Sequence, residues 1–173
     1  NWRAPDPWYE RAVQERAEWE THVQKQSGPT NQEEPSYAHA VGAVYRNADP
    51  SDIVVTAAGG LVGEVVQVWK PKQRNTFETE WGFSCMGYEI SGALGIKMAK
   101  PDQDVVVFLG DGSYLLSNSD IYSSVLYDQK LIIVLCDNGG HMVINRLQLA
   151  KGGKEYICNL RAARATNLQF VDF

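Results

Sequence analysis

The stretch FLGDGSYLL, residues 108–116, joins the end of an apolar run to a glycine–aspartate–glycine sequence. The run before it, residues 105–109, is short and continuously apolar, which is typical of a buried strand. Gly110, Asp111 and Gly112 by themselves are compatible with a plain turn, because both residue types tolerate tight backbone geometry. The meaning of Asp111 therefore depends on the residues that lie at fixed distances from it.

Two further apolar runs end in the same way. Residues 53–55 lead to Gly59 and Gly60, and residues 131–136 lead to the sequence DNGG at 137–140. Continuously apolar strands separated by helical stretches predict an α/β fold, a three-layer parallel sheet with helices on both faces. Ligands of such sheets bind beyond the carboxyl ends of the strands, where all three glycine breaks fall.

Helices are expected before the first strand. Asp6 reads as an N-cap with Pro7 at the first helical position, and residues 27–35 read as a loop or linker. Residues 37–46 predict a second, shorter helix. The apolar residues expected on one side of the first helix are Trp8, Ala12, Trp19 and Val23.

Another helix is expected between the second and third apolar runs. It would cover residues 117–128, with Ser117 and Asp120 forming a capping box at its start. Strand, helix and strand together fill roughly thirty residues, the length of one βαβ unit.

Composition narrows the function classes. The 173 residues are the size of one domain, and a net charge of −5 gives no basic footprint for a nucleic-acid partner. No apolar run reaches the roughly 18 residues of a spanning helix and no leader-like start is seen, so a cytoplasmic location without membrane contact is expected. The three cysteines are far apart; Cys136 reads as a buried thiol, and a zinc site is not expected.

Asp111 and Asn138 each follow a predicted strand, so their side chains are expected to converge at the rim of the sheet. A carboxylate, an amide oxygen and a nearby main-chain carbonyl form an all-oxygen set that suits Mg²⁺. Mg²⁺ held by so few protein ligands usually completes its shell with water and phosphates, and the amides of Gly112 and Ser113 are natural partners for phosphate oxygens. Either motif alone is more often a turn, but their occurrence at matching strand ends favours a diphosphate anchored through magnesium.

These residues resemble the signature of the thiamine-diphosphate-dependent enzymes, in which Gly-Asp-Gly is followed at this spacing by Asn-Asn. Asp137 stands where the first asparagine would be, and the second position is the one that binds metal in the family. The resemblance implies a thiamine-diphosphate-binding fold, pyrophosphate domain, with thiamine diphosphate and Mg²⁺ as cofactors. The metal ligands that it implies are Asp111, Asn138 and the carbonyl of Gly140.

The resemblance extends upstream to GFSCMGYEISGALGIKMA, residues 82–99, which is similar to the stretch that shapes the family's pocket for the two cofactor rings. It implies that Met86 props the cofactor in its bent shape and that the Ser84 carbonyl lies near the pyrimidine amino group. His141 is expected either in the site or in solvent. The cofactor-binding residues implied are Gly59, Gly60, Ser84, Met86, Gly110, Gly112 and Ser113.

Within the family, the phrases EWGFSCMGYEISGALGIKMA, CDNGG and INRLQL are most similar to hydrolases of inositol catabolism that open the ring of a cyclic dione. The reaction implied is carbon–carbon cleavage followed by hydrolysis. An acetolactate-synthase-like decarboxylase or carboligase is the first alternative. A non-catalytic Rossmann-type nucleotide-binding module is the second, although AAGGLVGE lacks the full G-x-G-x-x-G.

The activating glutamate of the family lies on a separate pyrimidine-binding domain. Glu78, Glu80 and Glu89 have no comparable context and are expected to be surface or helix residues. The resemblance therefore implies a fragment without catalytic residues of its own and inactive alone. Residues 1–35 would be a helix and linker from a preceding region, and residues 36–173 a C-terminally incomplete pyrophosphate domain. The full-length protein would be a homodimer or homotetramer that acts on a small molecule.

Overall fold

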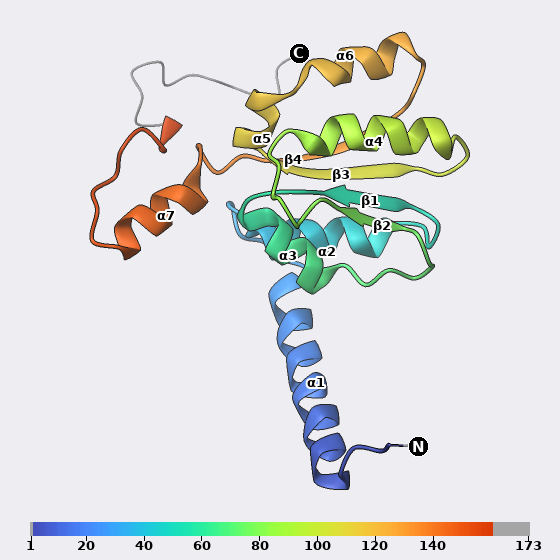
Figure 1. Ribbon diagram of the computed structural model, residues 1–173, viewed down its shortest axis with the longest axis vertical. Coiled ribbons are helices and arrows are strands. Elements are labelled where there is room, and N and C mark those ends of the chain that lie inside the picture. Colours follow the sequence, from blue (N-terminus) through green and yellow to red (C-terminus); the bar gives the residue numbers. More distant parts are fainter. Residues whose placement is uncertain (1, 161–173) are drawn as a thin grey trace.

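The computed structural model describes residues 2–160, and a sheet of four parallel strands lies at its centre (Figure 1). The strands are β1 (Ile53–Thr56), β2 (Phe77–Thr79), β3 (Val105–Gly110) and β4 (Ile132–Cys136), in the order β2-β1-β3-β4. The three predicted strands are confirmed. The short β2 was not predicted, because the sequence Phe-Glu-Thr forms no apolar run.

Helices cover both faces of the sheet, as predicted (Figure 1). Helices α2 (Tyr37–Asn47) and α3 (Gly60–Val68) lie on one side. Helices α4 (Tyr88–Ala99), α5 (Asp111–Leu116) and α6 (Ser119–Leu126) lie on the other. Helix α7 (Met142–Ala150) lies beyond the end of β4. Among residues 2–160 the structure has no helix that combines the length and the apolar character needed to cross a membrane.

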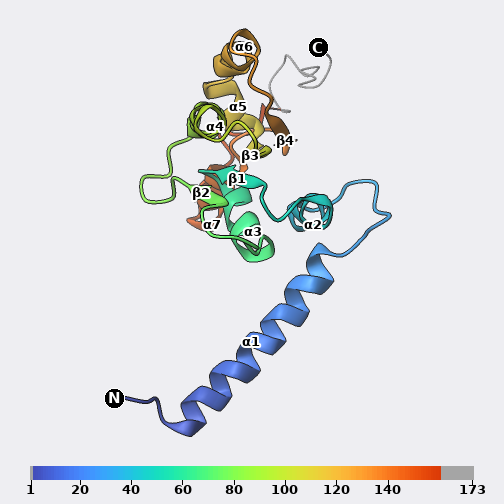
Figure 2. The ribbon, with the colours of Figure 1, turned by 90° about the vertical axis from the view of Figure 1, so that its right-hand side faces the viewer.

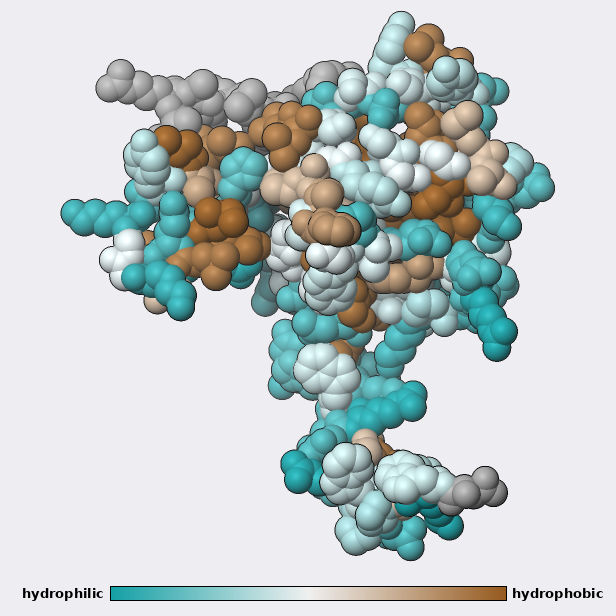
Figure 3. All heavy atoms as spheres, in the orientation of Figure 1, coloured by the Kyte–Doolittle hydropathy of each residue, from teal (hydrophilic) through white to brown (hydrophobic). Residues whose placement is uncertain are grey.

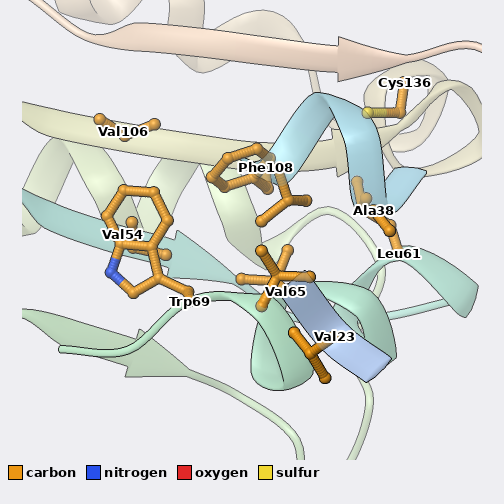
Figure 4. Close-up of a cluster of buried hydrophobic side chains, with 11 residues drawn as sticks. Val23, Ala38, Val54, Leu61, Val65, Trp69, Val106, Phe108 and Cys136 are labelled. Atoms are coloured by element: carbon orange, nitrogen blue, oxygen red, sulfur yellow. The ribbon is translucent and has the colours of Figure 1, made fainter. Parts of the chain in front are cut away.

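Each central strand contributes side chains to two cores, because successive residues of a strand point to opposite faces. Val54 and Phe108 pack with Trp69 on the face of the sheet that α2 and α3 cover (Figure 4). The Trp69 and Phe108 rings meet edge to face, with their centroids 5.9 Å apart. Val55 and Val107 face the opposite core, which contains Ile90 and Ala93 of α4. Burial on both faces explains why the strands read as continuous apolar runs.

Helix α1 (Asp6–Ser27) projects away from this body (Figure 2). The predicted cap is wrong by one residue: Pro5 is the N-cap, without a side-chain hydrogen bond, and Asp6 lies in the first turn. Of the apolar side predicted for this helix only Val23 is buried, whereas Trp8 is 73% and Trp19 49% exposed. Figure 3 shows mainly hydrophilic and intermediate side chains over the projecting part. Only the end of α1 nearest to α2 and α3 contributes to the core.

The capping box predicted at Ser117 is also wrong. A separate short helix, α5, occupies the residues directly after β3, and α6 begins only at Ser119, after Asn118 and without a side-chain cap. The Asp120 carboxylate instead accepts hydrogen bonds from the hydroxyls of Ser91 and Ser123. Asp120 therefore connects α6 to α4, a tertiary role that local spacing does not reveal.

Candidate cofactor site

A cavity of about 220 Å³ lies where β1, β3 and β4 end. The loops after these strands form its walls, as expected for the carboxyl edge of a parallel sheet. The structure brings every predicted metal and cofactor residue to this one cavity. Those residues are Gly59, Gly60, Ser84, Met86, Gly110, Asp111, Gly112, Ser113, Asn138 and Gly140.

Asp111 is the first residue of α5 and is 1% exposed. Neither of its carboxylate oxygens has a hydrogen-bond partner among the described residues. Burial, and then the negative charge of Asp137, raise the pKa of Asp111, while the nearby amides of Gly112 and Gly140 partly offset the rise. A buried carboxylate without a partner is costly, so its oxygens indicate a place for a cation.

The loop after β4 holds the second predicted ligand. The Asn138 side-chain oxygen accepts a hydrogen bond from the Gly140 amide at 3.2 Å, and its amide nitrogen donates to the Tyr37 hydroxyl. The Gly140 carbonyl accepts from the Met142 amide at 2.9 Å. Each of these carbonyl-type oxygens has a second lone pair that a cation could use.

Gly140 has a φ of +136°, and a Cβ there would lie 2.3 Å from the Cys158 carbonyl oxygen. The backbone around residue 158 also pairs with the loop: the Cys158 carbonyl accepts from the His141 amide at 2.8 Å, and the Leu160 amide donates to the Gly139 carbonyl at 2.7 Å. Glycine at position 140 is thus required by both the conformation and the space.

The residues present fit a magnesium ion with a diphosphate. The described part of the chain contains no cluster of three or more His, Cys, Asp or Glu, so a cation here would take few protein ligands and complete its shell from water or phosphate. A Cβ at Gly112 would lie 2.7 Å from His141 Nδ1, and one at Gly60 would lie 2.9 Å from a guanidinium nitrogen of Arg146. A side chain at either position would therefore collide with His141 or Arg146, and glycine avoids both collisions. The N-terminus of α3 at Gly60 adds amides that favour an anion.

The loop from Ser84 to the start of α4 has an unusual backbone. Ser84 has a φ of +53° and Gly87, the N-cap of α4, a φ of +95°. A non-glycine residue in the left-handed region costs on the order of 1–2 kcal/mol and is found most often where a loop meets a ligand. Met86 lies between these two residues and lines the cavity.

Sequence reasoning missed part of the lining. His141, which was expected either in the site or in solvent, lines the cavity beside Gly112. Tyr37 was not considered, because nothing in the sequence links the start of α2 to a loop 101 residues later. Burial raises the pKa of the Tyr37 hydroxyl. The other missed lining residues are Ala58, Leu61, Met142, Val143 and Ile144.

Glu89 lies on a helix, one of the two places expected for it, but its carboxylate is not at the surface. It lies in the first turn of α4 and is fully buried. Its carboxylate accepts hydrogen bonds from the Gly87 amide at 2.9 Å and the Ala58 amide at 3.4 Å. It therefore holds together two loops that border the cavity. Glu80 is exposed, as expected, and accepts from the amides of Phe83 and Cys85.

Residues 57–173 match the family described as thiamine pyrophosphate enzyme, C-terminal TPP binding domain. The chain is 43% identical over 124 residues to a 3D-(3,5/4)-trihydroxycyclohexane-1,2-dione hydrolase of Lacticaseibacillus casei, which covers 72% of this chain and 19% of the relative. Hydrolases of the same name from Halalkalibacterium halodurans and Listeria innocua are 40% and 47% identical over 124 and 113 residues, covering 72% and 65% of this chain. These matches cover 20% and 18% of those two relatives, so the chain spans about a fifth of their length.

Proposed function

The chain belongs to the C-terminal TPP-binding domain family of the thiamine pyrophosphate enzymes, and on that premise we propose that it binds thiamine diphosphate through a magnesium ion at the cavity beyond β1, β3 and β4. Asp111, Asn138 and the Gly140 carbonyl would hold the ion. The amides of Gly112 and Ser113, and the loop at Gly59 and Gly60, would receive the diphosphate.

One observation carries this proposal: the Asp111 carboxylate is buried at the end of β3 without a hydrogen-bond partner among the described residues. The ribose hydroxyls of a dinucleotide could donate hydrogen bonds to a carboxylate but would leave its charge in place. A divalent cation bridging to phosphate would neutralise it, and the oxygens of Asn138 and Gly140 lie on the same cavity.

For the enzyme as a whole, we propose hydrolysis of a carbon–carbon bond in 3D-(3,5/4)-trihydroxycyclohexane-1,2-dione, the compound in the names of the relatives. When bound, thiamine diphosphate supplies an electron sink for cleavage beside a carbonyl group. This chain's residues would contribute binding, charge neutralisation and a largely apolar wall formed by Leu61, Met86 and Ile144. An acetolactate-synthase-like carboligase remains the alternative that shares the same cofactor residues.

We further propose that the glutamate that activates the cofactor comes from residues other than those that line this cavity. The residues that line the cavity within the described part of the chain include no glutamate. Since the chain spans about a fifth of its relatives, a separate domain or a second subunit of a cytoplasmic oligomer would supply that group. An assay of the complete enzyme on the cyclic dione and on pyruvate tests the substrate; turnover of pyruvate alone would favour the carboligase.

Calorimetric titration of the 173-residue chain with thiamine diphosphate tests the cofactor. We expect binding with Mg²⁺ and none with a chelator, because the diphosphate would reach the protein through the ion. A thermal scan at about a hundred times the dissociation constant should show stabilisation by roughly 2.7 kcal/mol. Asp111→Asn should abolish the binding. Stabilisation by NAD without metal would instead support the nucleotide-binding module.

A further inference from the structure

Tyr37 lies on the cavity although it comes from the opposite end of the domain sequence. It is the first residue of α2, and its hydroxyl accepts a hydrogen bond from the side-chain amide nitrogen of Asn138. It also lies outside residues 57–173, which match the family. The contact is therefore a property of this chain's tertiary structure, and the family match does not specify it.

The position of Tyr37 is fixed by its own helix. Ser36 and His39 form a capping box, in which the Ser36 hydroxyl accepts from the His39 amide and the His39 ring accepts from the Ser36 amide. Ala38 and Val41, on the same helix, are buried in the core shared with α3. These contacts place the start of α2, and with it the Tyr37 hydroxyl, beside the loop after β4.

An asparagine side chain presents either an oxygen or an NH₂ group to a given point, and only the oxygen can bind a cation. The donation to Tyr37 assigns the NH₂ group to the α2 side of Asn138. The side-chain oxygen then lies on the other side, where it accepts from the Gly140 amide and keeps one lone pair. The Gly140 amide can only donate, so it requires the oxygen on its side, and the Tyr37 hydroxyl accepts from the NH₂ group that this orientation places opposite.

We propose that Tyr37 is a positioning residue of the metal site: its hydroxyl anchors the NH₂ group of Asn138 and so holds the side-chain oxygen where a cation can bind it. The inference rests on the proposed function, because it assumes that Asn138 binds metal. Groups behind the direct ligands of a metal typically contribute ten- to a hundredfold to its affinity when they orient those ligands.

Tyr37→Phe tests the role by removing only the hydroxyl. Mn²⁺ in place of Mg²⁺ allows free metal to be counted by electron paramagnetic resonance at saturating thiamine diphosphate, with cofactor alone as the blank. We expect a ten- to hundredfold weaker Mn²⁺ affinity, with an unfolding temperature of the metal-free chain close to that of the wild type. Tyr45→Phe is the matched control, because Tyr45 lies on the same helix and packs against Trp69 away from the cavity.

Asn138→Ala separates positioning of Asn138 from a merely structural role. It removes the side chain that Tyr37 holds, so Tyr37→Phe should change the Mn²⁺ affinity less than threefold in the Asn138→Ala background. An equal loss in both backgrounds, or no loss in the Asn138 background, would overturn the role of Tyr37 and leave the cofactor proposal standing. Absence of metal-dependent cofactor binding by the wild-type chain would overturn both.

Discussion

Asp111 combines a functional requirement with a cost to stability. Its carboxylate is buried without a hydrogen-bond partner in the described part of the chain, which is unfavourable until a cation neutralises it. Binding sites commonly contain groups that lower the stability of the ligand-free protein because function requires them. The Asp111 carboxylate should therefore lower the stability of the ligand-free chain and raise the stability of the ligand-bound chain.

We expect Asp111→Asn to raise the free energy of unfolding of the ligand-free chain by about 1–3 kcal/mol, because it removes a buried charge and keeps the shape. Each kcal/mol corresponds to roughly 2–4 °C in melting temperature at this size. Thermal unfolding of both proteins at pH 7 without metal measures the difference. A lower melting temperature for the variant would show that the carboxylate is well compensated by its surroundings.

The raised pKa of Asp111 predicts how this difference depends on pH. Folding favours the protonated carboxyl, so the unfavourable contribution is present above the folded-state pKa and disappears as the pH falls through it. We expect the gap in melting temperature between Asp111→Asn and wild type to be constant above the folded-state pKa of Asp111 and to narrow as the pH falls from there toward the ordinary pKa of an aspartate. A gap that widened on acidification would contradict the sign of the shift.

At the scale of the helices, the same glycine-to-alanine change should act in opposite directions. A Cβ at Gly95, inside α4, would meet no atom within 4 Å, whereas a Cβ at Gly42 in α2 would lie 2.1 Å from the Ser27 carbonyl oxygen of α1. Gly95→Ala should stabilise the chain by about 0.5–1 kcal/mol through lower backbone entropy of the unfolded state. Gly42→Ala should destabilise it by about 1–3 kcal/mol.

Urea unfolding followed by circular dichroism measures both changes. Gly63→Ala in α3 is a further control, because a Cβ at Gly63 would also have open space around it. A stable Gly42→Ala variant would mean that α1 moves away from α2 without cost, and the contact between Ser27 and Gly42 would then be unimportant for the fold.

At the scale of the whole molecule, stability should decrease from the sheet toward the start of α1. Residues 5–19 are all exposed, and this part of the helix is supported by local ion pairs such as Arg11 with Glu15 at 2.7 Å. Such exposed pairs contribute little because water screens their charges, and an unpacked helix of this length is marginal in water.

We therefore expect amides of residues 9–19 to exchange with deuterium at least about a hundredfold faster than those of β1 and β3, which are buried in two cores. Hydrogen exchange followed by mass spectrometry at pH 7 measures this. Equal protection of both regions at all protein concentrations would contradict the exposure of α1. Protection that rises with concentration would show that a second copy covers the helix.

The α/β class, the strands β1, β3 and β4 and the site residues directly after them could be predicted from the amino-acid sequence, because they depend on continuous apolar runs and on the residues that follow each run. Ser84 and Met86 follow no such run and were expected only from the family resemblance. Asp111 and Asn138 could be placed together in the same way, since parallel strands end at one edge of a sheet. Local patterns did not predict the cap of α6 or the strand β2, where spacing and apolar content are ambiguous.

Which side chains meet across long distances in the chain depended instead on tertiary packing. Tyr37 reaches Asn138, Glu89 ties Ala58 to Gly87, and a buried Asp111 is left without a hydrogen-bond partner among residues 2–160. The physical reason is that hydrogen bonding and burial at one point depend on elements from both faces of the sheet. Periodicity along the sequence indicates which face of a helix or strand a residue occupies, but it does not indicate which residue of another element packs against it.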